Sequence, residues 1–254
     1  MTTTPKLELR QQGAIALLTI NRPEVLNAID ADVCDALIAT VAALEAGDAT
    51  KVLVVTGAGE RAFSSGADLT HVRTLSGSSL RRYLEKTWQA FDAVARAPFI
   101  SIAALHGHVL GGGAELALAA DIRLAANNLS FGFPEMTLGS LPGSGGVQRL
   151  PLVVGQAKAL ELITLGTRLG AAEAASLRLV NHVVGKGEAL GAALAMADEI
   201  AKRPAESLRY AKIAIRMGDD HRIAGAMHGL VSSVRQADPS YRANTSAFDK
   251  DSKA

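Results

Sequence analysis

Two glutamates in glycine-rich surroundings are the residues of this sequence best suited to proton transfer. Glu115 follows the run Gly111 to Ala114, and Glu135 lies twenty positions further along, directly after Pro134. Two carboxyl groups in one apolar pocket can hold different protonation states, so that one acts as a base and the other as an acid. Backbone N–H groups in the glycine run could approach a ligand closely and stabilise negative charge on a carbonyl oxygen. A plain loop with Glu115 as a first-turn helix acid fits the same residues.

Strands and helices alternate around these glutamates. The glycine run separates a strand-like stretch, 99–105, from a helix-like stretch, 115–120. Further strands are expected at 14–20, 52–56 and 122–126, with helices from Asp30 to Gly47 and over 80–96. This alternation predicts an α/β core. After Val184 only helices are expected, at 188–203, at 206–217 beyond a break at Pro204, and at about 224–236.

A third glycine-rich segment gives the pattern its specificity. The strand-like run 51–56 leads into Gly57 to Asp68, and this order of motifs resembles the enoyl-CoA hydratase/isomerase (crotonase) superfamily over about residues 14–185. The residues that carry the resemblance are Asn21-Arg22-Pro23, Leu26-Asn27-Ala28, Ala62-Phe63, Gly66-Ala67-Asp68, Gly107, Gly111 to Glu115, Asp121, Phe131, Pro134-Glu135, Pro142-Gly143, Gly145-Gly146 and Gln148-Arg149-Leu150.

The resemblance implies a fold and an assembly. Residues 1–186 would form a crotonase-like spiral of ββα units that holds the active site. Residues 187–254 would form a C-terminal helical region that carries oligomer contacts, with a homotrimer or a homohexamer as the assembly.

It also implies an acyl-CoA substrate and roles for four residues. The backbone N–H groups of Ala67 and Gly112 would hold the thioester oxygen as an enolate forms. Glu135 would donate a proton to C2, and Glu115 would orient and activate the water that attacks C3. This is the chemistry of a 2-enoyl-CoA hydratase, which requires neither a metal nor a cofactor besides the coenzyme A of its substrate.

Coenzyme A is expected across the turn 21–27 and the loop 61–68. Arg22 and Arg61 are the basic residues best placed for its phosphates, although each also fits a solvated surface arginine. Asp68 could instead bind local backbone amides in a turn. The remaining substrate-binding positions implied by the resemblance are Ser65, Gly66, Asp68, Gly111, Phe133 and Gly143.

Three other functions compete with hydration. A double-bond isomerase on the same scaffold could work with Glu135 alone. A non-catalytic acyl-CoA- or RNA-binding homologue is a second alternative, and retention of both glutamates argues against it. The pattern Gly57-x-Gly59-x-x-Ala62 also fits a dinucleotide-binding turn, but Ser64 to Gly66 interrupt the helix that such a turn requires.

Composition sets wider limits. The 254 residues are 48% hydrophobic, carry a formal charge of +1 and contain 4% aromatics, which gives no support to nucleic-acid binding. No apolar run is long enough to span a membrane. Cys34 is the only cysteine, so an intrachain disulfide is excluded. A cytoplasmic location is expected, or import by a segment outside this sequence.

Some positions depart from the family pattern. Phe133 stands where hydratases often have glutamine, which predicts a less polar pocket. Ile100 stands in place of a common proline, and Arg178 replaces a usual glycine, so the helix before it should end differently. Ala243 and Asn244 replace a frequent Glu-Gly pair. This last change puts the usual cross-subunit contact to coenzyme A in doubt.

Overall fold

The computed structural model describes residues 5–216, 229, 231, 232 and 236. The chain divides into two compact units, 1–203 and 204–254. Helix α8 (Ala189–Ala201) packs on the core sheet of the first unit, so this boundary falls later than the one placed after Lys186 from the sequence. In the second unit α9 (Ala205–Arg216) follows Pro204, which confirms the predicted break. The helix predicted at 224–236 lies largely outside the described residues.

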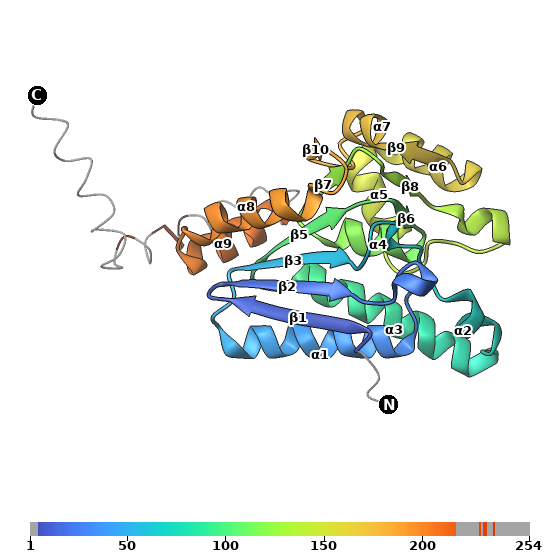
Figure 1. The fold of residues 1–254 in the computed structure, drawn as a ribbon, viewed down its shortest axis with the longest axis horizontal. Coiled ribbons are helices and arrows are strands. Elements are labelled where there is room, and N and C mark those ends of the chain that lie inside the picture. The colour runs from blue at the N-terminus through green and yellow to red at the C-terminus, as the bar shows by residue number, and fades with distance from the viewer. Residues whose placement is uncertain (1–4, 217–228, 230, 233–235, 237–254) are drawn as a thin grey trace, which may run out of the picture. The chain divides into compact units, whose positions relative to one another are not determined.

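The strands of the described residues form two sheets (Figure 1). The larger sheet has the order β1-β2-β3-β5-β7-β10, with only the β1–β2 pair antiparallel. The smaller sheet has the order β4-β6-β8-β9, with only β9 antiparallel to its neighbour. The strands are Leu7–Gln12 (β1), Ile15–Ile20 (β2), Val52–Gly57 (β3), Ala62–Ser64 (β4), Ile100–Leu105 (β5), His108–Leu110 (β6), Ile122–Ala126 (β7), Ser130–Gly132 (β8), Arg168–Gly170 (β9) and His182–Val184 (β10).

Two strands followed by a helix form the repeating unit of this arrangement. The pairs β3–β4, β5–β6 and β7–β8 each contribute their first strand to the larger sheet and their second strand to the smaller one. The predicted α/β spiral of ββα units is therefore confirmed. The helical segments are Pro23–Val25 (η1), Ala31–Gly47 (α1), Leu69–Arg73 (α2), Gly77–Arg96 (α3), Gly112–Ala119 (α4), Pro134–Leu138 (η2), Gly146–Val154 (α5), Gln156–Leu165 (α6) and Ala171–Ser176 (α7).

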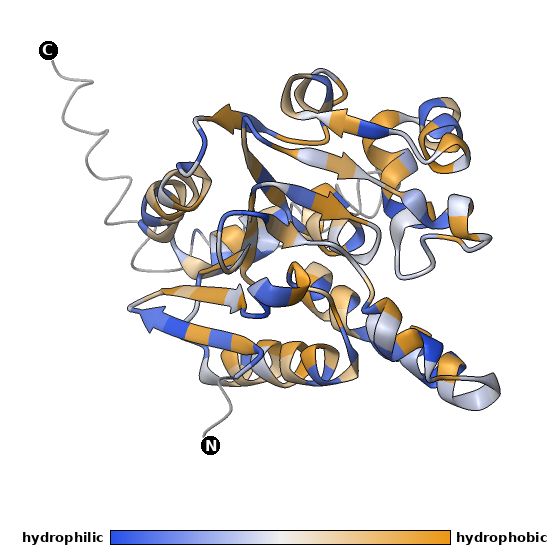
Figure 2. Cartoon of the chain, turned by 45° about the vertical axis from the view of Figure 1, so that its right-hand side comes forward, coloured by the Kyte–Doolittle hydropathy of each residue, from blue (hydrophilic) through white to orange (hydrophobic). Residues whose placement is uncertain are grey.

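Helices cover both faces of the larger sheet. Because successive side chains of a strand point to opposite faces, Leu53 and Val55 of β3 join the core that includes α1 and α3, whereas Val52 and Val54 pack beneath α8. Figure 2 shows the inner strands as hydrophobic and the outer strand β1 as largely hydrophilic. No helix in the described part of the chain is long and apolar enough to cross a membrane.

Candidate active site

The turns that carry the expected catalytic groups follow neighbouring parallel strands of the smaller sheet. Strand β4 leads into residues 65–68, β6 leads into the glycine run 111–113, and β8 leads into residues 133–135. The carboxyl ends of parallel strands lie at one edge of a sheet, where α/β proteins commonly place ligand sites. Segments from three ββα units therefore meet at this edge.

The N–H groups of Ala67 and Gly112 are both open to a ligand. No hydrogen bond among the described residues uses either group, and Gly112 is the first residue of α4, where an N–H has no partner within the helix. A Cβ built on Gly112 would lie 3.5 Å from the nitrogen of Ala67, so the two amides adjoin. The loop around Ala67 is held by backbone hydrogen bonds of 2.8–2.9 Å from Ser65 to Leu26, from Ile29 to Gly66 and from Asp68 to Ile29.

Two glycines allow this close approach. Gly66 has φ +97°, and a Cβ there would lie 2.6 Å from the carbonyl oxygen of Leu110. Gly111 has φ 51° and ψ −124°, and its Cβ would lie 3.0 Å from Oε1 of Glu135. A side chain at either position would strain the backbone, and it would push the two turns apart at Gly66 and displace the carboxyl of Glu135 at Gly111. The two glycines thus shape the space around the free amides.

Glu115 is held in the first turn of α4 and is only 4% exposed. Its Oε1 accepts the backbone N–H of Ser144 at 2.7 Å and that of Gly146 at 2.9 Å, whereas its Oε2 accepts no hydrogen bond from the described residues. Burial raises the pKa of Glu115 to about 7, and nearby Glu135 adds to the rise, while the two N–H donors and Arg149 oppose it. Glu115 can therefore exchange a proton near neutral pH.

Glu135 lies in the first turn of η2, and its carboxyl group has fewer hydrogen-bond partners among the described residues than that of Glu115. Its Oε2 is buried and has no hydrogen-bond partner among the described residues. Burial raises the pKa of Glu135 as well, with its own backbone N–H acting in the opposite direction. Phe133 is 1% exposed, and a Cβ built on Gly146 would lie 3.2 Å from a carbon of its ring and 3.1 Å from Oε1 of Glu115. The phenyl ring therefore contributes to the apolar surroundings of the Glu115 carboxyl.

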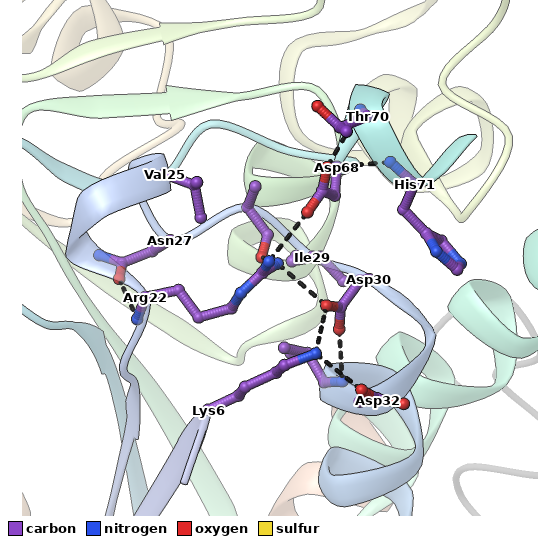
Figure 3. A network of polar contacts seen from close by, with 12 residues as sticks. Lys6, Arg22, Val25, Asn27, Ile29, Asp30, Asp32, Asp68, Thr70 and His71 are labelled. Carbon is purple, nitrogen blue, oxygen red and sulfur yellow. Dashed lines mark hydrogen bonds and ion pairs between the residues drawn. The ribbon is translucent and has the colours of Figure 1, made fainter. Parts of the chain in front are cut away.

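Arg22 and Asp68 bind each other, with an Arg22 Nη2 to Asp68 Oδ2 distance of 2.9 Å (Figure 3). The guanidinium group of Arg22 also donates to the carbonyl oxygen of Ala28 at 2.7 Å and lies 3.2 Å from Asp30. Asp68 in turn accepts the N–H groups of Thr70 and His71 at the start of α2, as the turn alternative foresaw. These contacts tie the turn 21–27 to the loop 61–68.

The other expected binding positions differ in exposure. Arg61 is exposed at the surface just before β4, and Ser65 is half-buried beside the free amide of Ala67. Gly143 is exposed in the turn before α5, and the N–H groups that reach Glu115 come from the following residues, Ser144 and Gly146.

Two supports of the site were not predicted from the sequence. The donors Ser144 and Gly146 act through backbone groups, which only the glycine-rich composition of 143–146 could have suggested. The buried side chain of Asn27 donates to the carbonyl oxygens of Ala58 and Ala62 at 2.9 Å and 2.7 Å. Its Oδ1 accepts the N–H of Arg22 at 3.0 Å, so Asn27 joins two loops of the site.

Two of the positions that depart from the family pattern have consequences for the local backbone. The N–H of Ile100 donates to the carbonyl oxygen of Lys51 at 3.0 Å, a bond that proline could not make. Arg178 has φ 61°, the left-handed conformation that favours glycine, and it follows the end of α7. The expectation of a differently ended helix is therefore wrong, because Arg178 itself adopts this backbone. Ala243 and Asn244 lie outside the described residues.

Comparisons with known proteins show the family to which the chain belongs. The sequence profile of the family described as "Enoyl-CoA hydratase/isomerase" matches residues 10–228. A short-chain-enoyl-CoA hydratase of Clostridium acetobutylicum is 35% identical over 210 residues, which are 83% of this chain and 80% of the relative. A crotonyl-CoA hydratase of Syntrophomonas wolfei is 36% identical over 219 residues, with 86% and 84% covered.

A solved structure shows the same likeness in three dimensions. The crystal structure of an enoyl-CoA hydratase from Bacillus anthracis superposes with a TM-score of 0.93 at 31% sequence identity, and 97% of each chain is covered. The family profile spans most of this chain, and the fold agrees over nearly all of it. The chain therefore belongs to the enoyl-CoA hydratase/isomerase family.

Proposed function

We propose that this protein is an enoyl-CoA hydratase that adds water across the C2=C3 bond of a 2-enoyl-CoA thioester. The observation that carries the proposal is the pair of buried carboxyls, Glu115 and Glu135, at the same sheet edge as the amides of Ala67 and Gly112, which have no hydrogen-bond partner among the described residues. The names of the relatives from Clostridium and Syntrophomonas support this reaction and a short acyl chain.

The amides of Ala67 and Gly112 bind the thioester oxygen. Attack of water at C3 moves the π electrons toward the carbonyl group, and the oxygen gains negative charge as an enolate forms. Donors already aimed at this position stabilise the charge without reorganisation, and the loss of one donor typically costs about 2.7–4 kcal/mol of barrier. Their contribution is larger in the transition state than in the bound substrate, so it accelerates the reaction.

Glu115 is the base in this proposal. Its Oε1 is anchored by two N–H donors, which leaves Oε2 to orient the attacking water and accept its proton. The hydroxyl group then bonds to C3. A carboxylate fixed through one oxygen presents the other in a defined direction, and such positioning favours a single face of the substrate.

Glu135 is the acid and transfers its proton to C2 of the enolate. The two carboxyls influence each other, so their protons leave in two steps that belong to the pair. Hydrogen-bond donors favour the ionised form of a carboxyl, and Glu115 receives two, whereas the buried Oε2 of Glu135 has none among the described residues. Burial raises the pKa of both carboxyls, and hydration proceeds from the form in which Glu115 is ionised and Glu135 is protonated.

Coenzyme A lies across the turn 21–27 and the loop 61–68 in this proposal. Arg22 is already paired with Asp68, so the exposed Arg61 is the better candidate for a phosphate contact. No additional cofactor is proposed. The assembly that we propose is a homotrimer or a homohexamer, as the resemblance implies. The location that we propose is the cytoplasm, where the buried Cys34 remains a free thiol.

Turnover on a panel of thioesters tests the proposal. Hydration of 2-enoyl-CoAs of increasing chain length is followed by the loss of enoyl-thioester absorbance, and 3-enoyl-CoAs are assayed in parallel for double-bond migration. Hydration should be the faster activity and should be greatest for short chains. Faster migration than hydration would assign the protein as an isomerase that uses Glu135, and binding without either activity would assign it as a non-catalytic homologue.

A further inference from the structure

Arg149 links the turn that holds Glu115, residues 144–146, to a neighbouring helix. It belongs to α5, its side chain is 15% exposed, and its Nη1 donates to the carbonyl oxygen of Ser144 at 3.2 Å. Its Nη2 lies 3.3 Å from Oδ1 of Asp92, and its guanidinium carbon lies 5.5 Å from the ring centroid of Trp88. Asp92 and Trp88 both belong to α3, so one side chain joins α3 to the turn before α5.

The turn that the Arg149 side chain binds is the turn that holds Glu115. Ser144 offers its carbonyl oxygen to Arg149 and its N–H to Oε1 of Glu115, and Gly146 supplies the second donor. The backbone N–H of Arg149 also donates to the carbonyl oxygen of Gly145 at 2.8 Å. A movement of the guanidinium group would therefore shift the donors that fix the carboxylate.

We propose that Arg149 is a positioning residue for the water-activating carboxylate, which it controls through the backbone of residues 144–146 while Asp92 and Trp88 hold its guanidinium group. This inference rests on the role of Glu115 as the base. The planar fork of arginine can serve a carbonyl and a carboxylate together while its face lies on an aromatic ring, whereas a lysine ammonium is a single point of charge.

The charge of Arg149 also acts on the site. It favours the ionised form of Glu115 and opposes the effects of burial and of Glu135 on the pKa of that carboxyl. On α3, Asp92 pairs with Arg149 at 3.3 Å and with the exposed Arg96 at 2.5 Å. Removal of the Arg149 charge should therefore raise the pKa of Glu115. The acid limb of the pH–rate profile, where activity falls because Glu115 becomes protonated, should then move to higher pH.

The experiment compares Arg149→Gln, Arg149→Lys and Arg96→Gln in the full chain. Arg96 binds the same Asp92 but is 78% exposed, so Arg96→Gln is the matched control and should leave kcat and the pH profile unchanged. Arg149→Gln should lower kcat about 10- to 100-fold, the range expected when a catalytic group is misplaced, with KM within about threefold. The acid limb of the pH–rate profile of Arg149→Gln should move to higher pH. Arg149→Lys should keep the acid limb at the wild-type pH because the positive charge remains. Its kcat should fall several-fold because an ammonium group lacks the planar, forked donors of the guanidinium group.

Two results would overturn the inference. One is a folded Arg149→Gln enzyme with wild-type kcat and an unmoved acid limb, and the other is a loss of kcat with the limb unchanged, as a purely structural role would give. If Arg149→Gln does not fold, Arg149→Lys decides, and wild-type kcat in that variant would refute the role. Glu115→Gln is measured alongside, because full hydration in that variant would refute the proposed function itself rather than the role of Arg149 alone.

Discussion

Replacing Gly111 with alanine places one methyl group against the carboxyl that we assign as the proton donor. The added Cβ would lie 3.0 Å from Oε1 and 3.5 Å from Cδ of Glu135. The first distance is shorter than an ordinary carbon–oxygen contact, so the carboxyl must retreat by a few tenths of an ångström or rotate. Gly111 itself has φ 51° and ψ −124°, a conformation that costs other residues about 1–3 kcal/mol.

The effect on turnover should exceed the effect on stability. General acid catalysis is worth about 10²- to 10⁴-fold, and a 1 Å misplacement can cost about 10²-fold, so we expect kcat for hydration to fall about 10- to 100-fold. Hydration is assayed by loss of enoyl-thioester absorbance, and urea unfolding measures the cost to stability. The variant should remain folded under assay conditions.

Gly155→Ala is the matched control. Gly155 has φ 79° and ψ 159°, which also disfavours alanine, but a Cβ there meets nothing within 4 Å. It should therefore lose comparable stability and retain wild-type turnover. Wild-type turnover in Gly111→Ala, or an equal loss in Gly155→Ala, would refute the placement of the Glu135 carboxyl beside Gly111.

Three further measurements address the amides, the assembly and the buried charge. Gly112→Pro removes one oxyanion donor at a helix position that accepts proline and should lower turnover about 10²-fold or more, whereas a folded, fully active variant would remove Gly112 from the site. Sedimentation should give about 79 or 158 kDa, three or six times the 26.4 kDa chain, and a monomer would contradict the assembly. Burial raises the pKa of Glu115 from 4.5 to about 7, so ionisation costs stability as pH rises through this range. Glu115→Gln should therefore resist urea better than wild type at pH 8, and this advantage should shrink as pH falls from about 7 to about 4.5 and be absent below that; no advantage at pH 8 would contradict the buried charge.

Local signals in the sequence predicted the long helices and the strands β2, β3, β5 and β7 of the larger sheet, whereas no strand of the smaller sheet was predicted. Asp30 was expected to cap a helix, and its Oδ1 accepts the N–H of Val33 at 3.0 Å at the start of α1. The helix ends at Gly47, as predicted. Such features depend on residues within a few positions of each other, so composition and spacing reveal them. The order of glycine-rich motifs likewise predicted which turns gather at the site.

Contacts between distant residues could not be predicted in the same way. Arg22 is paired with Asp68, 46 positions away, and the sequence left the arginine open to a phosphate. Glu115 is held by a backbone N–H that lies 29 positions further along. Backbone donors leave no side-chain signature, so the cradle of Glu115 and its support by Arg149 emerge only from the fold.

The hydration rate of Glu115→Gln tests the central claim most directly. The substitution keeps the size of the side chain but removes the base that activates water, so hydration of a 2-enoyl-CoA should fall about 10²- to 10⁴-fold. Migration of the double bond in a 3-enoyl-CoA, which needs only Glu135, should fall less. Glu135→Gln is measured beside it and should lose both activities. Hydration within a few-fold of wild type in Glu115→Gln, with faster migration in the native enzyme, would show that Glu135 is the sole catalytic carboxyl.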